Sequence, residues 1–222
     1  MNVMEVVTIK KIDKDFSRGE ELANSITHGL GVILSIAALV LLIVFASMKG
    51  DGWDIVIFII YGVTMTFLYM SSTLLHSFPN GRAKDFFEFL DHSAIYFYIA
   101  GSYTPILLLV IQGALGWVLF GIIWFLAIAG TVFKAFFVKR FIVLSTVLYV
   151  VMGWIIIFAW NPLIENLSKE ALILLVCSGL LYTLGSVFYV WRGFKYHHAV
   201  WHLFVVAGSV AFFFFVLFYL VF

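Results

Sequence analysis

The sequence predicts an all-α integral membrane protein, a bundle of seven transmembrane helices. Of its 222 residues, 64% are hydrophobic and only 11% are charged, whereas about a quarter of the residues in a soluble domain are charged. The mean hydropathy of +1.12 excludes a water-soluble protein with a polar surface. The apolar stretches are also long enough to span a membrane, because about 20 mainly apolar residues in a helix cross roughly 30 Å of hydrocarbon.

Seven apolar stretches, separated by short polar segments, define the expected helices. The first ends at KGDGWD, and the second ends at FPNGR, in which proline and glycine indicate a turn. The third contains Pro105 and is expected to kink there. The segment NPLIENLSKE is expected to be the longest of the later loops. The stretches cover about residues 25–48, 53–78, 89–111, 115–133, 141–160, 171–191 and 199–222.

The chain is expected to consist of a short cytoplasmic N-terminal segment, residues 1–24, and a seven-transmembrane helical domain, residues 25–222. The N-terminal segment has neither the apolar region nor the small-residue cleavage site of a signal peptide. The first apolar helix is therefore expected to direct the chain to the cell membrane as a multi-pass protein.

The positive charges predict the orientation, because cytoplasmic loops carry an excess of lysine and arginine. With the N-terminus cytoplasmic and the C-terminus outside, eleven of these residues fall in inner segments and two in outer segments. The inner residues are Lys10, Lys11, Lys14, Arg18, Arg82, Lys84, Lys134, Lys139, Arg140, Arg192 and Lys195, and the outer residues are Lys49 and Lys169.

The net charge and the cysteine content argue against a nucleic-acid-binding protein and against a disulfide-bonded one. The formal net charge of +1 provides no basis for nucleic-acid binding, and the single cysteine, Cys177, excludes an intrachain disulfide. Membrane lipids are the expected partners, and no residue pattern specifies an oligomeric state.

In this topology the histidines gather at the cytoplasmic end of the bundle. His198 and His202 begin the seventh stretch, and their i, i+4 spacing places both side chains on one helix face. Ser72 and His76, at the end of the second stretch, have the same spacing. Two imidazoles one turn apart form a bidentate clamp, and a third from another helix completes the three-histidine set of catalytic zinc, which leaves a fourth position for water. Asp91, at the start of the third stretch, would hydrogen-bond this water or an imidazole N–H.

A second interpretation places the histidines at the lipid headgroups, where an amphipathic ring is readily accommodated. The H-x-x-x-H pair also lacks the glutamate of the H-E-x-x-H metalloproteases. His28, in ELANSITHGLG, is either a polar contact at the start of the first helix or part of the outer shell of the site. His92 and His197 are expected to be interfacial, and Glu21 and Asn24 to cap or anchor the first helix.

At these residues the sequence resembles the hemolysin III family, part of the progestin and adiponectin-receptor-like group of seven-helix proteins. The segments that carry the resemblance are ELANSITHGLG, SSTLLHSF, FLDHSAIYFYIAGSYTP and HHAVWHLF, and it extends from Glu20 to the end of the chain. His92 follows the aspartate where the adiponectin receptors carry a tyrosine. Their long cytoplasmic N-terminal region has no counterpart here, so their hormone signalling is not expected.

The resemblance implies a zinc ion held by His76, His198 and His202, with water in the fourth position. It places Asp91 beside that water and Ser72 in the outer shell.

Three functions are open at this stage. The first is a zinc-dependent, ceramidase-like hydrolase of a lipid amide or ester near the cytoplasmic leaflet, with Asp91 as the catalytic group that positions or deprotonates water. The second is a non-enzymatic membrane sensor or homeostasis protein with structural zinc, which normally has four protein ligands. The third, suggested by the family name, is a pore-forming or membrane-lytic activity, for which the sequence offers neither a signal peptide nor a wide amphipathic face.

Overall fold

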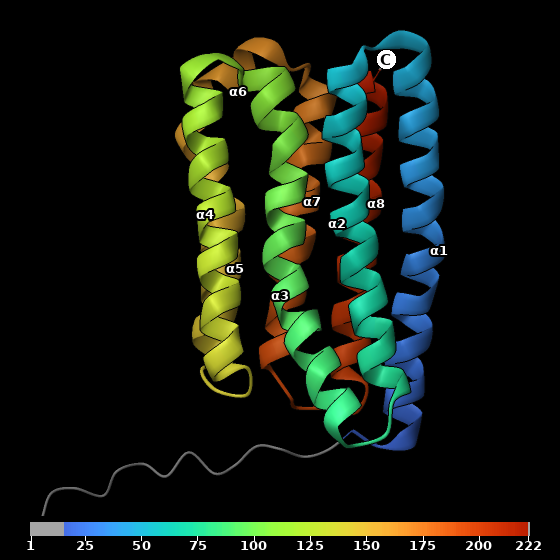
Figure 1. Cartoon of the computed structure of the whole chain (residues 1–222). Coiled ribbons are helices and arrows are strands. Elements are labelled where there is room, and N and C mark those ends of the chain that lie inside the picture. The colour runs from blue at the N-terminus through green and yellow to red at the C-terminus, as the bar shows by residue number, and fades with distance from the viewer. Residues whose placement is uncertain (1–15, 222) are drawn as a thin grey trace, which may run out of the picture.

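The computed structural model describes residues 16–221, and this part of the chain is a bundle of helices (Figure 1). Seven helical segments in it are long and apolar enough to cross a membrane, as the sequence predicts. The elements are α1 (Arg18–Lys49), α2 (Gly52–Ser77), α3 (Arg82–Pro105), η1 (Ile106–Ile111), α4 (Gly113–Phe137), α5 (Ile142–Trp154), η2 (Ile155–Ala159), α6 (Trp160–Asn166), α7 (Lys169–Val190), α8 (His197–Val216) and η3 (Leu217–Val221).

The helices run side by side along the long axis of the bundle (Figure 1). Helices α1, α2 and α8 group on one side, α4 and α5 on the other, and α3 and α7 lie between them. The start of α1 and the C-terminal end of the chain lie at opposite ends of the bundle (Figure 1). The starts of α1, α3 and α8 and the end of α2 therefore share one end, where the sequence predicts the histidines to gather.

Helix α1 begins earlier than the apolar pattern indicates, at Arg18 and not near residue 25. Ser17 and Glu20 form a capping box, in which the Glu20 backbone N–H donates to Ser17 Oγ (3.4 Å) and the Ser17 backbone N–H donates to Glu20 Oε2 (3.0 Å). The expected boundary between residues 24 and 25 thus falls inside α1. Glu21 and Asn24 lie within the helix and do not cap it.

The fifth span is longer than predicted, because the segment expected to be a long loop is mostly helical. The chain continues from α5 through the 3₁₀ turn η2 into α6, which ends at Asn166. Pro162 lies in the first turn of α6, where backbone N–H groups have no intrahelical acceptor and a proline is tolerated. The kink predicted at Pro105 corresponds to a change of helix type there, from α3 to the π-helix η1.

A hydrogen-bonded network of four hydroxyl groups joins α2, α3, α7 and α8 inside the bundle. Tyr69 and Tyr98 donate to Ser209 Oγ at 2.7 and 3.0 Å, and the Tyr182 hydroxyl lies 3.0 Å from Ser209 Oγ and 2.9 Å from the Tyr98 hydroxyl. We call these four residues the tyrosine network. It connects α2 and α8, which carry His76 and His202, to α3 and α7.

Candidate metal centre

Three histidines converge where α2 ends and α8 begins. His76, His198 and His202 each offer a ring nitrogen, and these three atoms lie within 4.8 Å of one another. The ring centroids of His198 and His202 are 4.5 Å apart, and that of His76 lies 5.1 and 5.3 Å from them. His76 and His202 are buried, with 6% and 1% of their surface exposed. The structure thus brings together a set of donors that suits a metal ion.

Contacts from α1 determine which nitrogen of His202 is free. His202 Nδ1 lies 3.2 Å from the Asn24 backbone carbonyl oxygen, which only accepts hydrogen bonds. It also lies 3.1 Å from Thr27 Oγ1, whose own proton is donated to backbone carbonyls of α1 at 2.9 Å. Nδ1 must therefore carry the proton, and the lone pair for a metal is on Nε2.

In His76, too, one ring nitrogen is engaged and the other is free. Its Nδ1 donates to Glu21 Oε2 at 2.6 Å, and the other carboxylate oxygen of Glu21 accepts from Lys84 of α3. His76 Nε2 is buried and has no hydrogen-bond partner in the described part of the chain. A buried nitrogen with its lone pair free is what a metal ligand requires.

Other polar atoms without protein partners surround these histidines. Most buried polar groups in proteins are hydrogen-bonded, yet within residues 16–221 Asn24 Oδ1, Ser72 Oγ and both ring nitrogens of His28 lack a partner. Ser72 lies one turn before His76, and the His28 ring stacks on His202 with centroids 3.4 Å apart. Unsatisfied donors and acceptors thus gather around the three nitrogens, as expected for residues that fit a bound ion and its solvent.

Asp91 is not part of the three-histidine group. Its carboxylate is not among the donor atoms that lie within 4.8 Å of one another in the described residues. It lines the same cavity as His28, His198 and His202. Asp91 thus shares a cavity with two of the three histidines and is not a fourth member of the set.

Two histidines expected at the lipid interface instead hold helices together. His92 Nδ1 donates to the Glu88 carbonyl oxygen at 2.7 Å, so its Nε2 accepts from the Tyr189 hydroxyl of α7 at 3.0 Å. His197 is 6% exposed and donates from Nδ1 to the Phe188 carbonyl oxygen at 3.0 Å. Both ring nitrogens of His92 and Nδ1 of His197 are therefore engaged within the protein.

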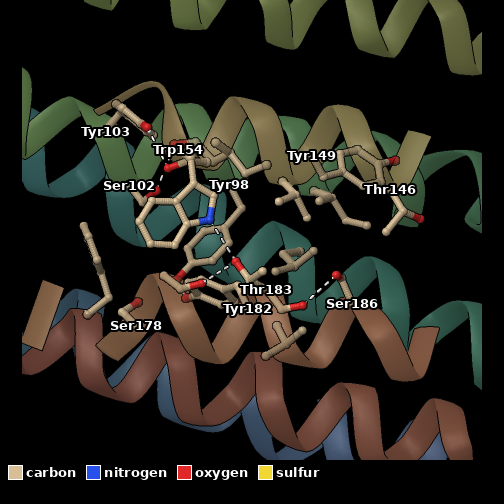
Figure 2. Close-up of a pocket in the computed structure, with 18 of the residues that line it drawn as sticks. Tyr98, Ser102, Tyr103, Thr146, Tyr149, Trp154, Ser178, Tyr182, Thr183 and Ser186 are labelled. Atoms are coloured by element: carbon tan, nitrogen blue, oxygen red, sulfur yellow. Dashed lines mark hydrogen bonds between the residues drawn. The ribbon is translucent and has the colours of Figure 1, made fainter. Parts of the chain in front are cut away.

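A cavity of about 160 Å³ extends from the histidines into the bundle, between α3, α5, α7 and α8 (Figure 2). On α8 its lining runs from His198 to Phe212, a helical distance of about 21 Å at 1.5 Å per residue. Several polar side chains in its wall hydrogen-bond to other protein atoms: Trp154 Nε1 donates to Thr183 Oγ1 at 2.9 Å, and Ser186 Oγ donates to the Thr183 carbonyl oxygen at 2.7 Å (Figure 2). The surface left for a ligand is therefore mainly apolar.

Seven membrane-length helices around a buried histidine site define a multi-pass protein of the cell membrane. Residues 16–213 match the family described as Haemolysin-III related, and the chain belongs to this family. It is 56% identical over 206 residues to the hemolysin-3 homolog of Bacillus subtilis (strain 168), covering 93% of this chain and 97% of that protein. It is 54% identical over 200 residues to hemolysin-3 of Bacillus cereus, covering 90% and 91%. The human monocyte to macrophage differentiation factor is 30% identical over 199 residues, covering 86% and 80%.

The sequence offered His28 as one candidate for the outer shell of the site, and its ring does stack on His202, but the contacts that Glu21 and Asn24 of α1 make with the histidines were missed. Glu21, Asn24 and His28 recur at spacings of three and four residues, which places them on one helix face. A polar stripe in an otherwise apolar helix was the available signal, and it points to the site rather than to a helix cap.

Proposed function

We propose that this protein is a zinc-dependent hydrolase of a lipid amide or ester, acting within the membrane. The observation that carries this proposal is the group of three histidine nitrogens within 4.8 Å of one another, two of them from histidines that line a mainly apolar cavity. Three imidazoles form a ligand set that leaves a position open for substrate or water. A site of this kind inside a bundle of membrane-spanning helices suits a substrate with hydrocarbon chains.

His76 and His202 would hold the zinc ion through their Nε2 atoms, and His198 would supply the third ring nitrogen. Zinc in such a set polarises a carbonyl and lowers the pKa of water at its open position to about 7. Burial suits such a site, because the electrostatic interactions of the zinc ion with its substrate and with the bound water strengthen when bulk water is excluded.

Asp91 would orient the attacking water and take its proton. Its carboxylate lines the cavity with His198 and His202 but lies outside their donor group, which suits a general base better than a ligand. The cavity would hold an acyl chain, because its length of about 21 Å along α8 exceeds the roughly 15 Å of hydrocarbon in one leaflet. The excess of lysine and arginine at this end of the bundle supports a site on the cytoplasmic side.

A membrane-lytic activity is a second proposal, favoured by the names of the two bacterial relatives. It makes a different prediction, because lysis of a membrane by a pore needs no general base. Lysis of red cells that persists in Asp91→Asn, with no lipid hydrolysis by the wild type, would favour it. A purely structural zinc is supported less well, because it normally has four protein ligands and Asp91 lies outside the group.

The test is metal analysis and lipid hydrolysis with the detergent-purified protein. We expect about one zinc per chain, as one three-histidine site binds one ion, and release of fatty acid from ceramide or from an ester lipid. The triple variant His76→Ala, His198→Ala and His202→Ala should lose both. A folded wild-type protein that takes up no zinc after resupply would overturn the proposal.

A further inference from the structure

Helix α1 supplies no member of the three-histidine group, yet it contacts two of the three. We infer that Glu21 is a positioning residue that fixes His76 as a metal ligand and thereby controls the affinity of the site. This inference rests on the proposed function, because it assumes that the three histidines bind a metal ion.

The Glu21 carboxylate is held at both ends. One oxygen lies 2.6 Å from His76 Nδ1 on α2, and the other accepts from the Lys84 ammonium on α3. The side chain of His76 is 2% exposed, and those of Glu21 and Lys84 are about one-fifth exposed. With both oxygens engaged, the carboxylate cannot rotate away from the imidazole without losing the ion pair to Lys84.

The hydrogen bond from His76 Nδ1 to Glu21 also determines the state of Nε2, on the other side of the imidazole ring. A carboxylate only accepts hydrogen bonds, so His76 must carry its proton on Nδ1 and present the lone pair of Nε2. A carboxylate on the remote nitrogen also makes an imidazole a stronger ligand, and loss of such a partner typically weakens metal binding 10- to 100-fold. His76 Nε2 is the buried nitrogen without a partner in the described residues, so the contact acts on an atom that is available for a metal.

A purely structural role for Glu21 makes a different prediction. Its ion pair with Lys84 joins α1 to α3, and that link alone would act through the packing of the helices. In that case, removal of Lys84 should harm the site as much as removal of Glu21. If Glu21 acts through His76, loss of Lys84 should matter much less, because the carboxylate still accepts from Nδ1.

Three variants of the full chain separate these roles: Glu21→Gln, Lys84→Met and, as a matched control, Ser25→Ala. Ser25 lies one turn beyond Glu21 on α1, and its hydroxyl is 2.8 Å from that of Ser77 on α2. The control therefore breaks a contact between the same two helices without touching a ring nitrogen. Zinc affinity is measured by competition with a chelator. The absorption spectrum of the cobalt-loaded protein reports the ligand geometry, and thermal unfolding of the metal-free protein reports folding.

We expect zinc affinity to fall about 10- to 100-fold in Glu21→Gln, with an altered cobalt spectrum and an unchanged unfolding temperature of the metal-free protein. Lys84→Met and Ser25→Ala should bind zinc within about threefold of the wild type, since neither removes the imidazole contact. Glu21→Asp, which keeps the charge but shortens the side chain, should be intermediate and serves if Glu21→Gln does not fold.

Two results would overturn the inference while leaving the metal site in place. One is wild-type affinity in Glu21→Gln alongside loss of zinc in His76→Ala. The other is an equal loss in Glu21→Gln and Lys84→Met, which would assign the effect to the link between α1 and α3. A wild-type protein that binds no zinc at all would instead remove the proposed function and this inference with it.

Discussion

The tyrosine network and the histidine site are two polar clusters inside one apolar bundle, and they differ in how completely their hydrogen bonds are satisfied. In the network, the four hydroxyl protons of Tyr69, Tyr98, Tyr182 and Ser209 match the four contacts among them. At the histidine site, His28, Ser72 and His76 keep buried polar atoms without a partner in residues 16–221.

This difference separates a cluster whose hydrogen bonds are made within the protein from one that could bind a metal ion. Leaving a buried polar atom unpaired costs about 1–3 kcal/mol, and a metal ion with its solvent, if bound at the three convergent nitrogens, would supply partners to the atoms around it. A network whose hydrogen bonds are all made within the protein needs no ligand, and those hydrogen bonds contribute to the stability of the fold. Substitutions in the first cluster should therefore change stability, and substitutions in the second should change metal binding.

The largest expected effect is the loss of zinc in His202→Ala. This change removes one arm of the i, i+4 clamp on α8, and zinc affinity should fall more than about 100-fold, beyond the range for residues that only support a ligand. The measurement is zinc content after dialysis against a weak chelator. Metal content equal to that of the wild type would refute the assignment of this ligand.

The next largest effect is expected for Asp91→Asn, which should lower the hydrolytic activity and leave zinc binding unchanged. The amide keeps the shape of the side chain but cannot take a proton from water, so hydrolysis should fall about 10²- to 10⁴-fold while zinc content stays the same. The rate of fatty-acid release is measured together with the metal content of the same preparation. Loss of both would mean that Asp91 is a ligand, and that the site closes around the metal.

Ser209→Ala should destabilise the protein without affecting zinc. It deprives the Tyr69 hydroxyl of its 2.7 Å acceptor and removes the hub of the other two phenols, so we expect a loss of about 1–3 kcal/mol in the free energy of unfolding. The matched control is Ser102→Ala, because Ser102 Oγ donates to the Ile99 carbonyl oxygen of its own helix and takes no part in the tyrosine network. Thermal unfolding of both variants in detergent, with zinc content measured in parallel, checks this. A fall in zinc content without loss of stability would erase the distinction between the clusters.

How much of this comparison could be read from the sequence depends on whether a feature is local to one helix. The pairing of His198 with His202, and of Ser72 with His76, follows from helical spacing alone. The stacking of His28 on His202 and the contact of Glu21 with His76 depend on how α1 is rotated against α2 and α8, which no periodicity specifies. The early start of α1 was missed because its first turn is polar and is closed by a capping box between Ser17 and Glu20, and apolar periodicity does not detect such a turn.

The variant with the smallest expected effect, Lys134→Met, tests whether every buried polar atom without a partner marks a binding site. Lys134 on α4 is fully buried, and its ammonium has no hydrogen-bond partner in the described part of the chain. No group of three metal-ligating side chains accompanies it among those residues. We therefore expect Lys134→Met, which fills a similar volume, to leave zinc binding unchanged and to keep or raise stability by up to about 1 kcal/mol, since apolar replacement of a buried charge is often neutral or stabilising.

The control for that variant is Lys139→Met, beyond the end of α4. Lys139 is paired, at 2.7 Å from Asp85 and 3.4 Å from Glu88, and these carboxylates hold its pKa above the ordinary value for lysine. The raised pKa means that the pair stabilises the fold below the ordinary lysine pKa of about 10.4, and that this contribution is lost as the pH rises through the higher folded value. Because the lysine side chain is about half exposed, its loss should cost less than about 1 kcal/mol and should diminish in salt. Thermal unfolding at low and high salt distinguishes the two lysines: a salt-independent loss of stability in Lys134→Met would show that its charge has a partner the fold depends on.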